Sequence, residues 1–110
     1  IWIGPDDDAK GDRVAGPLAA LDLVGERSDM PAVYSAFDVF VLPSHREGFS
    51  RSAMEAAACG RAMVLTDIRG CREIGTHDRE LRFVPARNSR ALAEAIRRLI
   101  DDPAARERLG

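Results

Sequence analysis

The chain has 110 residues, of which 45% are hydrophobic and 31% charged, and its formal net charge at pH 7 is −2. These values fit one small globular domain with a modest core, and they argue against a nucleic-acid partner or a polybasic membrane-binding segment. No apolar stretch approaches the roughly 20 residues of a transmembrane helix. We expect no signal peptide, and the strand-like opening IWIG suggests that an upstream part of the domain is missing.

The first third of the chain predicts two short strands, a polar loop between them and a helix. Residues 1–4 and 21–24 are the short apolar runs of the predicted strands. The segment 28–37 is predicted to be a short helix, because Ser28 or Asp29 can cap its N-terminus.

The middle of the chain contains two uninterrupted apolar runs with a helix between them. Residues 38–43 and 62–67 show no polar alternation, which is typical of parallel strands that are buried on both faces. Residues 50–59 are Ala-rich and predict a helix, which Gly60 ends in the C-cap region. We expect the two runs to be central, parallel strands, with this helix crossing between them.

The last third repeats the alternation of helix and strand. A turn with a short helix is predicted over 69–75, a strand over 81–85 and a helix over 90–100, which Asn88 or Ser89 can cap. Asp102-Pro103 ends that helix, and a final helix follows. Four apolar residues of the helix 90–100 share one face: Leu92, Ala95, Ile96 and Leu99.

Strands that alternate with helices form βαβ units with right-handed crossovers. The predicted fold class is therefore α/β, an open, doubly wound parallel sheet that is truncated at its N-terminus. Ligands bind such sheets outside the carboxyl ends of the strands. We therefore expect a binding site directly after the strand 38–43.

The segment that follows this strand, SHREGFSRSAMEAAACG, carries features of an anion site. Gly48 allows a sharp turn and a close approach of a ligand, and Ser50 can cap the next helix. The first free N–H groups would then belong to Arg51, Ser52 and Ala53. They point outward with the positive end of the helix dipole and favour a phosphate, to which Arg51 can add a positive charge.

Two acids, Glu47 and Glu55, flank this predicted phosphate site. A phosphate repels a carboxylate, so these acids suit hydroxyl-rich groups on either side of it, because a carboxylate accepts two hydroxyl hydrogen bonds. A phosphate with a diol at each end describes a nucleoside diphosphate sugar. Simpler explanations stay open: Arg51 and Glu55 are suitably spaced for a surface ion pair, Glu47 can be a solvated acid, and Ser50 can be only a cap.

The cysteines and histidines indicate neither a disulfide framework nor a metal site. Cys59 and Cys71 are too few for a disulfide scaffold, which favours a reduced, cytoplasmic compartment. Cys59 fits a small buried thiol, whereas Cys71 lies in a polar turn. His45 and His77 lack the spacing of zinc ligands, so we expect no metal and no cofactor.

The stretch FDVFVLPSHREGFSRSAMEAAACGRAMVLTDIRGCREI resembles the donor-binding signature of retaining GT-B glycosyltransferases of glycosyltransferase family 4 (glycosyl transferases group 1). That family carries two acids separated by seven residues, which Glu47 and Glu55 match. The later LRFVPARNSRALAEAIRRLIDDPAARERL resembles the family's ending. The chain departs from the pattern shortly after Gly60, where a proline is common and this chain has GRAMV, and at Glu80, where a glycine is usual. The family's phosphate-binding Arg and Lys would lie upstream of this chain.

The resemblance implies a Rossmann-like half of a GT-B fold, with residues 1–110 as a partial donor-binding domain and the acceptor domain absent. By resemblance, Glu47 is the catalytic residue and contacts the transferred sugar, Glu55 binds the ribose, and Gly4 lies near the nucleotide. The residues expected to hold the donor sugar and diphosphate are Glu47, Gly48, Phe49, Ser50 and Arg51.

The function that the resemblance implies is the donor-binding half of a retaining glycosyltransferase. The complete enzyme would move a sugar from a nucleoside diphosphate sugar to an acceptor hydroxyl in polysaccharide biosynthesis. The expected partners are the nucleotide-sugar donor, the N-terminal acceptor domain and a second copy of the fragment, and the full-length enzyme is expected at a membrane surface. The fragment alone is expected to be inactive. The alternatives are a non-catalytic nucleotide-sugar-binding module and a GT-B-related sugar-nucleotide epimerase.

Overall fold

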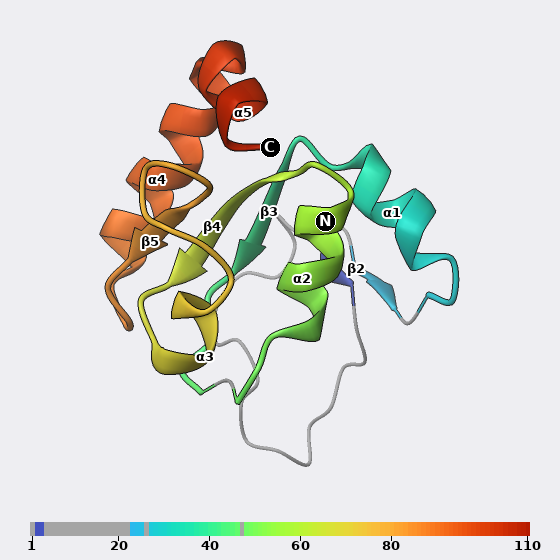
Figure 1. The fold of residues 1–110 in the computed structure, drawn as a ribbon, viewed down its shortest axis with the longest axis horizontal. Coiled ribbons are helices and arrows are strands. Elements are labelled where there is room, and N and C mark those ends of the chain that lie inside the picture. The colour runs from blue at the N-terminus through green and yellow to red at the C-terminus, as the bar shows by residue number, and fades with distance from the viewer. Residues whose placement is uncertain (1, 4–22, 26, 47) are drawn as a thin grey trace. The chain divides into compact units, whose positions relative to one another are not determined.

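The computed structural model describes residues 2–3, 23–25, 27–46 and 48–110 of the chain (Figure 1). They belong to two units, Ile1–Met30 and Pro31–Gly110, each of which is described by itself. In the first unit, β1 (Trp2–Ile3) and β2 (Leu23–Gly25) pair in parallel with a shift in register between Trp2 and Ile3. The short strands predicted at 1–4 and 21–24 are therefore confirmed at residues 2–3 and 23–24, and their other residues lie outside the described parts of the chain.

The second unit is built on a three-stranded parallel sheet with flanking helices. Its strands are β3 (Val39–Leu42), β4 (Ala62–Thr66) and β5 (Arg82–Val84), and they pair in the order β3-β4-β5. Its helices are α1 (Met30–Ala36), α2 (Arg51–Ala58), α3 (Arg69–Arg72), α4 (Ser89–Asp101) and α5 (Pro103–Leu109). The predicted α/β class and the parallel sheet are confirmed.

The pairing of β3 with β4 is in parallel register, from Val39 opposite Ala62 to Leu42 opposite Leu65, and α2 connects the two strands. All five residues of β4 are buried, as the prediction of a central strand requires. In β3 only Phe40 is buried. The expectation of a central strand is confirmed for β4, whereas within the three-stranded sheet of this unit β3 pairs with β4 alone.

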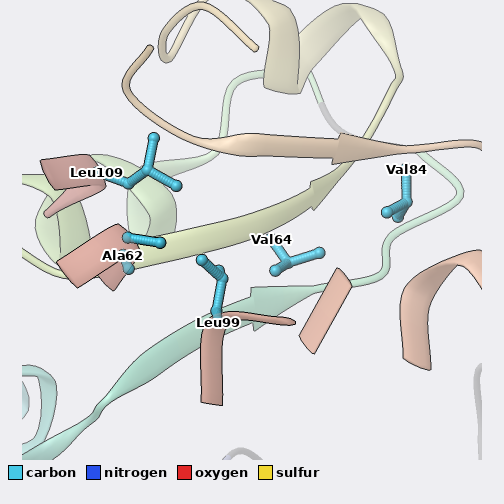
Figure 2. Packing of buried hydrophobic residues seen from close by; sticks show 6 residues of the cluster. Ala62, Val64, Val84, Leu99 and Leu109 are labelled. Carbon is cyan, nitrogen blue, oxygen red and sulfur yellow. The ribbon is translucent and has the colours of Figure 1, made fainter. Parts of the chain in front are cut away.

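One face of this sheet is covered by α4 and α5. Figure 2 shows Ala62 and Val64 of β4 packed with Leu99 of α4 and Leu109 of α5, and Val84 of β5 belongs to the same cluster. Each fully buried leucine contributes roughly 1.5–3 kcal/mol to folding. The apolar face predicted for the helix 90–100 is confirmed, since its Leu92, Ala95 and Ile96 are partly buried against this cluster.

Helix α2 packs against β3 and β4 through residues outside that cluster. Its buried residues are Ala53 and Ala56, and small side chains there let the helix approach the sheet closely. Successive side chains of a strand point to opposite faces, so Met63 and Leu65 point to the face opposite that of Ala62 and Val64. The sheet therefore has helices on both faces, as a doubly wound fold requires.

The predicted helix ends are set by local sequence. Gly60 has φ +65°, and the N–H groups of Gly60 and Arg61 donate to the carbonyls of Ala57 and Ala56, which closes α2 in a Schellman motif. At the start of α4, Oδ1 of Asn88 accepts the Ala91 N–H at 3.0 Å.

Two further sequence expectations concern cysteines and membranes. Cys59 and Cys71 form no disulfide bond. Cys59 is only half-buried, whereas Cys71, expected in a polar turn, is fully buried in α3 because the helix turns its side chain inward. Within the described parts of the chain, no helix has the length and apolar character needed to cross a bilayer.

Candidate functional site

The loops that leave β3 and β4 lie at the carboxyl edge of the sheet, where parallel α/β sheets bind ligands. The ends of the two strands are joined by Thr66, whose Oγ1 donates to the Leu42 carbonyl at 3.3 Å. The loop after β3 leads into α2, and the loop after β4 leads into α3. This edge of the sheet therefore brings together two segments that are far apart in the sequence.

Ser50 caps the N-terminus of α2, as predicted. Its side chain is only 1% exposed, and its Oγ accepts the Ala53 N–H at 3.2 Å. The prediction that Ala53 offers a free N–H is therefore wrong, because the cap uses it. The amides of Arg51 and Ser52 have no acceptor among the described residues and stay available to an external anion.

A cavity of about 420 Å³ lies between the loop after β3, which leads into α2, and the beginning of α3. A Cβ on Gly48 would meet no heavy atom within 4 Å, so this glycine faces open space. Among the described glycines only Gly60 has a positive φ. The sharp turn that we expected at Gly48 therefore needs no left-handed backbone, and the glycine leaves room for a close ligand. The cavity is lined by His45, Arg46, Gly48, Ile68 and Arg69.

The cavity carries positive charge on two exposed guanidinium groups. Among the described residues, neither Arg46 nor Arg69 pairs with a carboxylate. Asp67, which precedes Ile68, is instead bound by Arg72, with Nε and Oδ1 2.6 Å apart. This hydrogen bond lowers the pKa of Asp67 and raises the pKa of Arg72. Asp67 is neutralised by Arg72, and no carboxylate of the described residues neutralises Arg46 or Arg69, so the cavity is suitable for an anion.

Glu55 lies one turn into α2 with an exposed side chain. Its Oε2 accepts a hydrogen bond from the hydroxyl of Tyr34 on α1, at 3.1 Å. Tyr34 is buried, and burial together with the Glu55 hydrogen bond raises the pKa of Tyr34 to about 12. Within the described part of the chain, Glu55 does not pair with Arg51, so the surface ion pair left open by the sequence is absent.

The predicted site residues are only partly brought together. Gly48 lines the cavity, Ser50 caps α2, and the side chains of Arg51 and Glu55 are exposed on the first turns of that helix. Phe49 is 55% exposed. Glu47, the predicted catalytic residue, and Gly4, predicted near the nucleotide, lie outside the described residues.

Sequence reasoning missed the contribution of the loop after β4. Ile68 and Arg69 line the cavity, yet the sequence analysis treated their segment only as a turn with a short helix. A signal was available, because this segment also follows a buried parallel strand directly and so starts at the ligand-binding edge. Tyr34 was likewise missed, and no short-range pattern joins it to Glu55.

A second hollow of about 270 Å³ lies at the carboxyl ends of β4 and β5 and the start of α4, and His45 borders both hollows. Its lining includes Thr66, Val84, Pro85, Arg87 and Asn88. Throughout the part of the chain that the structure describes, no cluster of three or more His, Cys, Asp or Glu side chains could hold a metal ion.

Comparison with known proteins relates the chain to enzymes that transfer sugars. The family model described as glycosyl transferases group 1 matches residues 1–102. The N,N'-diacetylbacillosaminyl-diphospho-undecaprenol alpha-1,3-N-acetylgalactosaminyltransferase of Campylobacter jejuni is 39% identical over 83 residues, covering 76% of this chain and 22% of that enzyme. The glycogen synthase of Mycobacterium tuberculosis is 36% identical over 104 residues, covering 93% of this chain and 24% of that enzyme.

Solved structures show the same arrangement of strands and helices. Anabaena Alr3699/HepE in complex with UDP matches with a TM-score of 0.76 at 27% identity, over 80% of this chain and 24% of that one, and it is also known with UDP-glucose. The C-terminal domain of LpcC, a glycosyl transferase group 1 family protein from Francisella tularensis, matches with a TM-score of 0.69 at 29% identity, over 83% of this chain and 50% of that one.

The chain spans about a quarter of the length of the curated relatives that it matches. The family model matches residues 1–102 of the chain, and the relatives named above are also enzymes that transfer sugars. The parallel sheet and flanking helices also match the solved structures. The chain therefore belongs to the glycosyl transferases group 1 family.

Proposed function

We propose that this chain is the nucleotide-sugar-binding part of a retaining glycosyltransferase. The complete enzyme would move a sugar from a nucleoside diphosphate sugar to an acceptor hydroxyl in polysaccharide biosynthesis. The observation that carries this proposal is the cavity lined by Arg46 and Arg69 at the carboxyl edge of the sheet, where the loop after β3 leads into α2. The UDP and UDP-glucose complexes of Anabaena Alr3699/HepE, a structural relative, support it.

The diphosphate of the donor would occupy the start of α2. The amides of Arg51 and Ser52 have no acceptor among the described residues, and the positive end of the helix dipole adds roughly 0.3–1 kcal/mol for a bound anion. Arg46, in the loop after β3, and Arg69, the first residue of α3, would contribute cationic partners. We also propose that the backbone around Gly48 and Phe49 contacts the sugar and diphosphate, since Gly48 leaves open space beside the cavity.

The two acids of the sequence would serve the hydroxyl groups at either end of the donor. Glu55 would accept hydrogen bonds from the ribose hydroxyls, because its carboxylate is exposed and is not neutralised by Arg51. Glu47 would accept hydrogen bonds from hydroxyls of the transferred sugar and serve as the catalytic residue of this half. Neither carboxylate would contact the phosphates, which would repel it.

The chemistry of this half would be the stabilisation of a leaving group. Negative charge grows on the diphosphate as the bond to the sugar breaks, and amides and guanidinium groups already in place stabilise that charge more strongly than reorganising water does. The acceptor hydroxyl would be held by a separate N-terminal domain and would attack with retention of configuration. We place the enzyme in the cytoplasm, at a membrane surface, with the donor as substrate and no cofactor.

The test is a calorimetric titration of the chain with UDP, ADP, GDP and the corresponding free nucleosides. We expect one nucleoside diphosphate to bind and its nucleoside to bind at least tenfold more weakly. Glu55→Gln should weaken diphosphate binding, whereas Glu107→Gln, at an exposed position on α5, should not.

Equal affinity for nucleoside and nucleoside diphosphate would contradict the assignment of α2 to the diphosphate. Unchanged affinity in Glu55→Gln would contradict the ribose role. Sugar transfer by the complete protein from the matching nucleotide sugar then separates an enzyme from a binding module that holds the donor without using it.

A further inference from the structure

The hydrogen bond between Tyr34 and Glu55 joins a buried donor to an exposed acceptor. The Tyr34 side chain is 3% exposed, whereas the Glu55 side chain faces solvent. The two residues come from different helices and are 21 positions apart, and the bond measures 3.1 Å. A surface carboxylate has no need of such a partner for its own solvation, because water can supply every hydrogen bond that it accepts.

The Tyr34 ring is held in place by two other aromatic rings. Its centroid lies 6.1 Å from that of Phe37 and 5.9 Å from that of Phe40, both in edge-to-face geometry. Such contacts are favourable for aromatic pairs, and Phe40 is itself buried in β3. The hydroxyl therefore presents its proton from a defined position at the rim of the core.

We propose that Tyr34 is a positioning residue for nucleotide binding: its hydroxyl holds one oxygen of Glu55 so that the rest of the carboxylate faces the ribose hydroxyls. This inference rests on the proposed ribose role of Glu55. With Oε2 engaged, Oε1 and the second lone pair of Oε2 still accept hydrogen bonds. A vicinal diol offers two donors, and the remaining acceptor sites of the carboxylate can take both.

Pre-ordering of Glu55 strengthens binding, because a free glutamate side chain loses rotamer freedom when a ligand fixes it. The bond to Tyr34 imposes part of that order before the nucleotide arrives. It also draws the carboxylate toward α1 and away from Arg51, which follows the cap of the same helix. The raised pKa of Tyr34, about 12, keeps the hydroxyl protonated and able to donate at neutral pH.

A purely structural role for Tyr34 predicts different behaviour. In that case the hydroxyl would merely satisfy its own hydrogen bond at the edge of the core. Removal of the hydroxyl would then change stability and would affect all ligands alike. A positioning role instead ties the effect of Tyr34 to the ribose hydroxyls and to the presence of Glu55.

The test is a double-mutant cycle with Tyr34→Phe, Glu55→Ala and the double variant. Tyr34→Phe keeps the ring contacts and removes only the hydroxyl. The probe is the tightest binder among UDP, ADP and GDP, compared with its 2′,3′-dideoxy analogue. We expect Tyr34→Phe to weaken the ribonucleotide about three- to tenfold, as for one hydrogen bond, and to leave the dideoxy affinity unchanged. In the Glu55→Ala background, Tyr34→Phe should cause no further loss.

Four outcomes would overturn the proposal. Equal losses for the ribonucleotide and the dideoxy analogue, or a loss that persists in the Glu55→Ala background, would indicate a structural role. A loss in Glu55→Ala without one in Tyr34→Phe would reject the positioning role and keep the ribose role of Glu55. Unchanged affinity in Glu55→Ala would reject both, and with them the ribose assignment under the proposed function.

A measurement on the native sequence covers the case in which Tyr34→Phe does not fold. The chain contains a single tyrosine, so a carbon-13 label on its Cζ reports Tyr34 alone in an NMR spectrum. We expect the signal to shift in Glu55→Ala and to keep its bonded position when UDP, ADP or GDP saturates the chain. A nucleotide that shifts the signal to the Glu55→Ala position would show that the bond breaks on binding, and would overturn the proposal.

Discussion

Replacement of Ser50 by alanine removes a buried cap from the helix that opens the candidate site. The Ser50 side chain is 1% exposed, and its Oγ is the acceptor for the Ala53 N–H at 3.2 Å. Ala53 is itself fully buried. Water therefore has little access to the amide that the substitution leaves without a partner, and the full desolvation cost of that amide remains.

The expected loss is about 1–2 kcal/mol in the free energy of unfolding. Loss of a serine cap costs about 0.5–2 kcal/mol in general, and a buried unsatisfied donor costs about 1–3 kcal/mol. Both ranges describe the same hydrogen bond, so they overlap and are not added. For a domain of this size, each 1 kcal/mol lowers Tm by roughly 4–8 °C.

Urea and thermal unfolding followed by circular dichroism measure this loss. The matched control is Asn88→Ala, which removes an equivalent bond from Oδ1 to the Ala91 N–H at the start of α4. Asn88 is exposed, so water can replace its oxygen, and we expect a smaller loss. A loss below about 0.5 kcal/mol for Ser50→Ala, or one no larger than that of Asn88→Ala, would refute the argument from burial.

Four further predictions concern charge, pH, activity and association. Arg46→Gln and Arg69→Gln should each weaken nucleoside diphosphate binding about three- to tenfold and reduce the salt dependence of that binding, because each removes a cation from the cavity. Calorimetry measures the affinities, and Arg97→Gln on α4 is the control. An equal loss of affinity in the control would contradict the prediction. The wild-type chain should lose stability relative to Tyr34→Phe as the pH rises from 10 toward about 12, since the Tyr34 pKa is near 10 in the unfolded chain and about 12 in the folded one. This contribution is fully present below pH 10 and falls by about 1.4 kcal/mol per pH unit above it; parallel urea midpoints for the two proteins would reject it. The chain alone should transfer sugar at least a hundredfold more slowly than the complete enzyme, because it spans about a quarter of the length of its relatives; comparable transfer rates would disprove this expectation. Light scattering should show the chain associated with a second copy, and a monomer would disprove that expectation.

Much of the fold could be predicted from local sequence. Uninterrupted apolar runs identify β3 and β4 as parallel strands, and the burial of every β4 residue agrees with that pattern. The N-caps Ser50 of α2 and Asn88 of α4, and the end of α2 at Gly60, also follow from local sequence, because each of these residues lies within one turn of the helix end that it sets. The site could also be predicted at the start of α2 from local sequence, because Gly48 and Ser50 follow directly after an apolar strand.

Other features depend on tertiary structure because they join segments that no local pattern relates. The cavity exists only where the loop after β3 meets the start of α3, which brings Arg46 and Arg69 to one hollow. The order β3-β4-β5 in the sheet of the second unit likewise depends on which strands pair. Hydrophobic periodicity identifies the face of an element that is buried, but the packing of the elements decides what that face meets. The contact between Tyr34 and Glu55 was therefore decided by the packing of α1 and α2 at the sheet.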